Sequence, residues 1–156
     1  MTHAEPRTQD LWEILQAIPD PEIPVISLVE LGIIRTVEWT HQRPRITISP
    51  TYVGCPANDV IQEDIRKAMS DAGIGPIDIV TALAPPWTTD WITPAGMDKL
   101  RAYGIAPPSR APTHTCPQCG STQTQIVSPF GSTPCKGIAR CLSCTEPFEF
   151  FKCSAT

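Results

Sequence analysis

Two Cys-x-x-Cys pairs in the last quarter of the chain constrain its fold more than any other feature. The pairs are Cys116 with Cys119 and Cys141 with Cys144, and 21 residues separate them. A Cys-x-x-Cys turn directs two sulfurs at one centre, and two such turns supply the four ligands of a tetrahedral Zn(II) site. The separation slightly exceeds the usual ribbon spacing of roughly 15–20 residues, and a longer hairpin would absorb the difference. The spacing therefore predicts a zinc ribbon.

Other uses of these cysteines stay open at this point. They would pair as disulfides in an oxidising compartment, and sets of four thiolates also hold iron-sulfur clusters. His114 lies two residues before the first pair, but a histidine ligand is unnecessary when four cysteines suffice. A site closed by four thiolates has no open coordination position, so we expect it to be structural. We expect the ribbon strands over residues 122–127, 136–140 and 147–152, and a domain this small should unfold without its ion.

The region before the ribbon has the hydrophobic pattern of a small α/β domain of order α-β-β-α-β. The first helix starts with Thr8 as its N-cap and ends at Pro19. The expected elements are a helix over 8–18, strands over 33–40 and 45–49, a helix over 56–72 and a strand over 77–83. A strand-helix-strand crossover normally makes the two strands that it joins parallel, so we expect the last two strands to be parallel.

A final short helix and a proline-rich segment follow this pattern. Thr93 caps the helix, which runs from Pro94 to Arg101. Residues 106–112 contain three prolines and read as a stiff linker. The sequence therefore predicts an α/β (α+β) chain with an α/β domain over 1–105, a linker over 106–112 and a four-cysteine zinc-ribbon domain over 113–156.

Cys55 lies outside the ribbon and is the most interesting single residue of the first domain. It precedes Pro56, and a proline at the first helical position would make Cys55 the N-cap of the helix. A sulfur there would meet free amides and the positive end of the helix dipole, which favour the thiolate. The alternative is a buried, inert cysteine.

Composition excludes several classes of function. The start of the chain has no basic and apolar leader, and no apolar stretch approaches the ~18 residues of a membrane span, so we expect a cytoplasmic protein. The net charge is −4, and the 12 Lys and Arg are scattered singly, which argues against nucleic acid as a partner. The sequence has no nucleotide-binding loop and no motif of a hydrolase or metalloprotease, so we expect no self-contained catalytic apparatus.

Three carboxylates and two further thiols remain as candidates. Asp20, Glu22 and Glu30 lie beside the predicted hairpin and are either metal or proton-transfer groups or, as is commoner, turn caps and ion-pair partners. Cys135 and Cys153 fall on facing ribbon strands in roughly similar register. They could meet as a redox pair or a second metal clip, or they could be placed by chance.

Several long motifs resemble known families. Residues 20–34, together with the Cys55-Pro56 helix start, resemble the small domain of iron-sulfur assembly factors of the SufT-like type; that family usually has Asp where this chain has Glu30. Further motifs resemble the D subunits of phenylacetyl-CoA epoxidase systems, the PaaD family. They are Thr-Thr-Asp-Trp-Ile-Thr at 88–93, Tyr-Gly-Ile-Ala-Pro-Pro at 103–108, Phe-Gly-Ser-Thr-Pro-Cys-Lys at 130–136, Glu-Pro-Phe at 146–148 and Phe-Lys-Cys at 151–153.

The resemblance implies an accessory, non-catalytic component of aerobic phenylacetate catabolism that helps to mature a metal centre in its partners. It assigns a transient iron or iron-sulfur cargo to Cys55, matches Asp20 and Glu22 to an acidic loop, and gives Cys135 and Cys153 a role. The implied partners are the oxygenase or reductase subunits of the epoxidase system. Because one cysteine cannot fill four cluster positions, a homodimer or a partner interface is expected. The alternative is a zinc-ribbon scaffold that docks oxygenase subunits without metal transfer.

Overall fold

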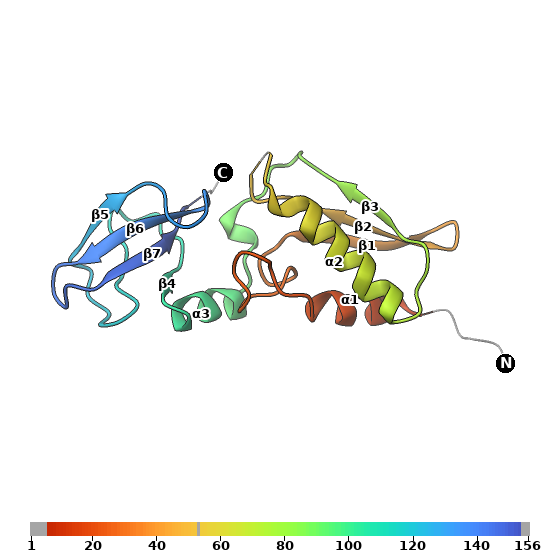
Figure 1. Ribbon diagram of the computed structural model, residues 1–156, viewed down its shortest axis with the longest axis horizontal. Coiled ribbons are helices and arrows are strands. Elements are labelled where there is room, and N and C mark those ends of the chain that lie inside the picture. Colours follow the sequence, from red (N-terminus) through yellow and green to blue (C-terminus); the bar gives the residue numbers. More distant parts are fainter. Residues whose placement is uncertain (1–5, 53, 154–156) are drawn as a thin grey trace. The chain divides into compact units, whose positions relative to one another are not determined.

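The computed structural model describes residues 6–52 and 54–153 and divides the chain into two compact units, 1–87 and 88–156 (Figure 1). The first unit has the predicted order α-β-β-α-β. Its elements are α1 (Thr8–Gln16), β1 (Ile34–Thr40), β2 (Arg43–Ile48), α2 (Ala57–Asp71) and β3 (Asp78–Thr81). The three strands form one sheet in the order β1-β2-β3, with β1 antiparallel to β2. The expected parallel pairing across α2 is confirmed, because β3 runs parallel to β2.

The hairpin between β1 and β2 is tighter than the sequence suggested. His41 and Gln42 both have positive φ angles, 51° and 65°, which is the conformation of a two-residue hairpin turn. The predicted turn covered residues 41–44, but β2 already begins at Arg43. Pro44 misled the prediction because a proline usually interrupts a strand, although here it is buried within β2.

The core of the first unit lies between the sheet and its helices. On β2, Ile46 and Ile48 are fully buried, whereas Arg45 and Thr47 are only half-buried. Figure 1 shows α2 crossing in front of the sheet, and α1 packs against β1 and α2. The inward residues of the two helices, spaced as a helical stripe requires, are Leu11, Leu15, Ile61, Ile65 and Met69.

The second unit contains the ribbon. Its elements are a 3₁₀ turn η1 (Thr89–Trp91), α3 (Pro94–Ala102), β4 (Ile105–Ala106), β5 (Thr124–Ser128), β6 (Lys136–Cys141) and β7 (Pro147–Phe151). The strands lie in the order β4-β7-β6-β5. As predicted, Thr93 caps α3, because its side chain accepts a hydrogen bond from the backbone N–H of Gly96 at 3.0 Å.

The strand β4 was not foreseen, and it changes where the chain divides. Ala106 was expected in a linker, but it pairs with Phe150 of β7. Since α3 packs against β4, this helix belongs to the ribbon unit, although it was expected to close the first domain. A two-residue strand carries too few side chains to show a periodic pattern, so only long-range pairing reveals it.

Within the described residues, no helix is both long enough and apolar enough to cross a membrane.

Candidate functional site

The four knuckle cysteines converge on one point in the second unit. The sulfurs of Cys116 and Cys144 are 3.7 Å apart, those of Cys119 and Cys141 are 3.5 Å apart, and all four lie within 4.8 Å of one another. A tetrahedral ion with Zn–S bonds of about 2.3 Å separates its sulfurs by about 3.8 Å. The sulfur positions therefore fit a zinc ion, and His114 is not part of the group.

Backbone hydrogen bonds shape both knuckles. In the first, Gly120 adopts a φ of +77° and its N–H donates to the carbonyl of Cys116 at 2.9 Å. In the second, which joins β6 to β7, the N–H of Cys144 donates to the sulfur of Cys141 at 3.4 Å. The hydroxyls of Ser121 and Ser143 link the two knuckles at 2.9 Å. These bonds preorganise the sulfurs at one centre.

The protonation of these thiols shows why the cluster suits a cation. The N–H of Cys144 and other hydrogen bonds lower the pKa of Cys141 to about 6. The N–H of Glu146 favours the thiolate of Cys144, but burial and the neighbouring thiols outweigh it and raise the pKa to about 12. One thiolate thus forms easily and suppresses the ionisation of the next. A divalent ion would remove this conflict, because it binds all four as thiolates.

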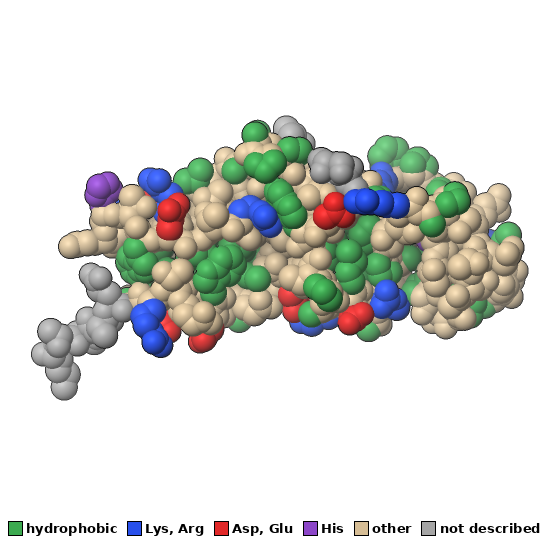
Figure 2. Space-filling view, turned by 180° about the vertical axis from the view of Figure 1, so that it is seen from behind, with side chains coloured by type: hydrophobic (Ala, Val, Ile, Leu, Met, Phe, Trp, Pro, Cys, Tyr) green, Lys and Arg blue, Asp and Glu red, His purple; other side chains and the backbone are tan. Residues whose placement is uncertain are grey.

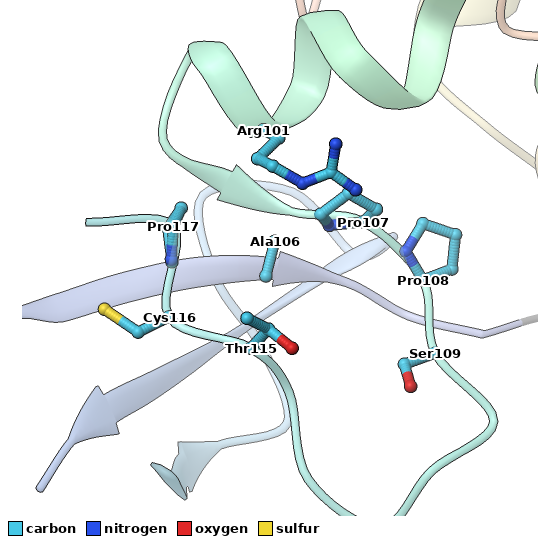
Figure 3. A pocket seen from close by; sticks show the side chains of 8 residues that line it. All are labelled: Arg101, Ala106, Pro107, Pro108, Ser109, Thr115, Cys116 and Pro117. Carbon is cyan, nitrogen blue, oxygen red and sulfur yellow. The ribbon is translucent and has the colours of Figure 1, made fainter. Parts of the chain in front are cut away.

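Two of the four knuckle cysteines lie in the core of the ribbon, whereas Cys119 is exposed. Cys116 and Cys141 are buried in the apolar cluster of the ribbon, together with Ala106, Ala139, Phe148 and Phe150. A cavity of about 200 Å³ lies beside Cys116, lined also by Arg101 and Ser109. Figure 3 shows the Cys116 sulfur pointing away from both of these side chains. Four thiolates at one centre would fill every coordination position of a tetrahedral ion.

His114 was uninformative in the sequence but has a defined place in the ribbon core. Its ring stacks on Phe150 with 4.0 Å between centroids, and burial lowers its pKa. The carbonyl of His114 accepts a hydrogen bond from the hydroxyl of Thr124 at 2.6 Å. A lone histidine gives no sequence signal for such stacking, because the contact depends on the fold.

Cys55 lies at the start of α2, one residue further out than predicted. Pro56 is the N-cap and Ala57 the first helical residue, so the prediction that Cys55 itself caps the helix is wrong. Pro56 has helical backbone angles, φ −67° and ψ −20°, so it lies at the boundary of the helix, where a difference of one residue is ordinary. Cys55 is buried at 9% exposure, between the exposed residues Gly54 and Pro56.

Two acidic residues of the 20–34 segment bond to its own backbone. Asp20 is buried, and its Oδ1 accepts hydrogen bonds from the N–H groups of Glu22 and Ile23 at 2.9 and 2.8 Å. Glu30 accepts from the N–H of Ser27 at 2.9 Å, and the Ser27 hydroxyl accepts from the N–H of Glu30 at 3.1 Å. These contacts are those of turn caps.

The first unit does not assemble a second ligand cluster among the described residues. The knuckle cysteines form the one group there of at least three Cys, His, Asp or Glu side chains that could hold a metal ion. Cys55, Asp20 and Glu22 are therefore not brought together as a metal site of this kind within one chain.

Cys135 and Cys153 flank the far end of the β6-β7 pair. The ladder pairs Lys136 with Phe151, and the N–H of Lys152 donates to the carbonyl of Cys135 at 2.9 Å. Cys135 thus faces Lys152, and Cys153 is one residue out of register. The Cys135 sulfur lies 3.0 Å from the Thr133 hydroxyl, and that of Cys153 lies 3.9 Å from the Thr89 hydroxyl. No disulfide joins cysteines within the described residues, and a functional role of this pair stays a prediction.

Comparison with known proteins defines the class of the two parts. Residues 8–76 match the model of an iron-sulfur cluster assembly protein, and residues 104–152 match that of a PaaD zinc β-ribbon domain. The chain thus joins an iron-sulfur-assembly domain to a zinc ribbon. Over 97% of its length it is 45% identical to the putative D subunit of the 1,2-phenylacetyl-CoA epoxidase of Escherichia coli K12, of which it covers 96%. The chain belongs to this family of epoxidase D subunits, PaaD.

Other relatives match the first unit. An Fe-S protein maturation auxiliary factor of Porphyromonas gingivalis is 33% identical over 59% of this chain and 89% of its own length. The crystal structure of a domain of unknown function from Bacillus anthracis superposes with a TM-score of 0.56 at 26% identity, over 60% of this chain and 90% of that one. The fold of the first unit is therefore that of the iron-sulfur assembly domains.

Proposed function

We propose that this protein is an accessory maturation factor of a phenylacetyl-CoA epoxidase system, and that Cys55 transiently holds iron or an iron-sulfur cluster on its way to another subunit of that system. The cargo is delivered and does not stay with the chain. The zinc ion that we propose on Cys116, Cys119, Cys141 and Cys144 is resident and structural. The family of the chain and the maturation factors related to its first unit support this accessory role.

The division of the cysteines between the two units carries the proposal. Four thiols of the ribbon close on one another and leave no ligand position for a cargo. Cys55 is the only cysteine of the first unit, and it falls inside the span that matches the iron-sulfur assembly model. A thiolate at this place is the soft ligand that iron and its clusters require.

A single thiol also dictates that the site is shared. A cluster is usually held by four protein ligands, and the carboxylate of Asp20 is already engaged by two backbone N–H groups. The remaining ligands must come from a second chain, either the recipient protein or a second copy in a homodimer. Such a shared site binds weakly in one chain and transfers its cargo readily.

The surface charge supports a protein partner. The chain carries 12 Lys and Arg against 16 Asp and Glu, and Figure 2 shows the two signs interspersed over the visible face. Nucleic-acid affinity depends on a concentrated basic face. We therefore propose other epoxidase subunits as the partners.

The test is anaerobic purification followed by iron, zinc and acid-labile sulfide analysis, before and after cluster reconstitution. We expect about one zinc per chain in every sample and additional iron after reconstitution. Cys55→Ser should lose this iron and keep its zinc, while Cys153→Ser, an exposed thiol of the other unit, should keep both. Iron binding that survives in Cys55→Ser would refute the proposal.

A scaffold function is the second candidate, and the closed knuckle site favours it. A ribbon whose metal has no open position can dock partner subunits without any metal traffic. In that case Cys55→Ser would mature the epoxidase as well as the wild type does. The iron content of the epoxidase, after co-production with each variant, separates the two functions.

A further inference from the structure

The outer edge of the ribbon is unusually apolar for an edge strand. In the described part of the chain, β5 has a strand partner on one side only, because it is the last strand of its sheet. Residues 122–135 contain no charged side chain. Ile126 is 52% exposed and Val127 is 64% exposed. Edge strands normally carry charges that prevent pairing with other chains. An edge strand without charges therefore indicates that a partner pairs with it.

The ladder between β5 and β6 bulges at this place. Ile126 pairs with Ala139 and Ser128 with Ile138, which leaves Val127 as the extra residue. Bulges re-aim a side chain and are frequent beside functional surfaces. The bulge therefore accounts for the exposure of Val127 in the middle of a short strand.

The loop after β5 is held in one conformation by Glu149 of β7. The carboxylate of Glu149 accepts a hydrogen bond from the N–H of Ser132 at 2.8 Å and bonds to the Ser132 hydroxyl. The ammonium of the buried Lys136 lies 3.5 Å from the same carboxylate. A Cβ on Gly131 would collide with the Glu149 carboxylate and would force that carboxylate to shift from its present position. The loop is thus anchored at several points.

This anchored loop displays an aromatic side chain to solvent. Phe130 is 65% exposed, and the Lys152 ammonium lies 4.3 Å from the centroid of its ring. Aromatic side chains that are held in place before binding are typical central residues of protein interfaces. An exposed Phe130 on a fixed loop has this character. Because Lys136 and Glu149 neutralise each other, Lys152 supplies the charge beside this ring.

We propose that Ile126, Val127, Phe130 and Lys152 form a docking surface for an extended, apolar segment of a partner protein that carries a carboxylate opposite Lys152. Backbone groups of the β5 edge pair with the segment, the ring of Phe130 packs against its apolar side chains, and Lys152 selects the carboxylate. A second copy of this chain fits less well, since its own edge is uncharged and would bring another Lys152 instead of an acid. The choice of epoxidase subunits as the partner rests on the proposed function. The existence of the docking surface does not depend on that function.

The test measures the affinity of the full-length, zinc-loaded protein for the purified oxygenase and reductase subunits of the epoxidase system. Val127→Lys and Phe130→Ala should each weaken binding to one of them about tenfold or more, as expected for central interface residues. Lys152→Glu should weaken it similarly, whereas Lys152→Arg should retain it, because a cation is preserved. Leu83→Lys is the matched control, since Leu83 is an equally exposed apolar residue (53%) of the other unit. Zinc content and circular dichroism confirm that each variant is folded.

The docking surface is wrong if Val127→Lys keeps wild-type affinity, or if Leu83→Lys loses as much affinity as Val127→Lys. It is also wrong if Val127→Lys turns a dimer into a monomer and leaves the affinity for the epoxidase subunits intact. Absence of wild-type binding to any of these subunits would overturn it too. The proposed function fails by a different readout. If Cys55→Ser docks normally and still matures the epoxidase, metal delivery through Cys55 is wrong while the docking surface stands.

Discussion

Removing the metal from the ribbon should unfold the second unit and spare the first. Among the described residues, the apolar cluster of the ribbon has six members, and two of them, Cys116 and Cys141, belong to the proposed zinc site. The two phenylalanines of this cluster contribute at most about 3 kcal/mol each on burial. A structural zinc site contributes about 10–16 kcal/mol at neutral pH, which matches the whole stability of most domains, about 5–15 kcal/mol. Without the ion, the ribbon therefore lacks the free energy to stay folded.

The assay is a two-dimensional amide NMR spectrum before and after a chelator is added at neutral pH. Signals from residues 104–152 should collapse to unfolded positions, and signals from 8–76 should stay, because the first unit has its own core. Cys141→Ser should reproduce the collapse without chelator, while Cys153→Ser, which lies outside the knuckles, should not. A metal-free ribbon that keeps its dispersed signals would refute the reasoning, since its core would then suffice.

Two further predictions concern contacts of β7. Burial alone would raise the pKa of Glu149, but hydrogen bonds from Ser132 and the charge of Lys136 outweigh it, and the pKa is lowered. The ionised Glu149 carboxylate therefore stabilises the fold fully above its pKa in the unfolded chain, about 4.3. This stabilisation is lost only as the pH falls through the lower pKa that Glu149 has in the folded chain. In urea unfolding, Glu149→Gln should lower the free energy of unfolding by about 1–3 kcal/mol. This loss should be the same at every pH between about 5.5 and 8, and a loss that shrinks within this range would contradict the lowered pKa of Glu149. Gly137→Ala places a Cβ 2.7 Å from Cε1 of Phe150, so it should destabilise the ribbon by about 1–3 kcal/mol in the same assay. An unchanged midpoint of urea unfolding would show that the Phe150 ring can move aside.

Elements with a strong local signal were predicted well. The stripe of apolar residues on α2 and the Thr93-Pro94 start of α3 gave helices with nearly the expected bounds. The three long ribbon strands were also found, within one or two residues at their ends. In each case the period of the side chains or a cap decides the structure before any distant contact forms.

The starts of α1 and α2 were each predicted with an error of one residue. Arg7, and not Thr8, is the N-cap of α1, because the carboxylate of Asp10 bonds to the N–H of Arg7 at 2.7 Å. At α2, Pro56 stands at the cap where Cys55 was expected, and it makes no side-chain capping bond. At α1 the choice between adjacent caps depends on a bond worth about 1 kcal/mol, which the residue types alone do not rank.

The sequence by itself indicated the four-cysteine cluster of the ribbon and the separation of Cys55 from it. The spacing of Cys116, Cys119, Cys141 and Cys144 is a local property, since each knuckle is a turn of four residues. Tertiary structure alone decided two things: that β4 joins the ribbon, and that Glu149 fixes the loop of Phe130. Each of these rests on pairings or burial in the folded chain, and such contacts leave no period or spacing in the sequence to read.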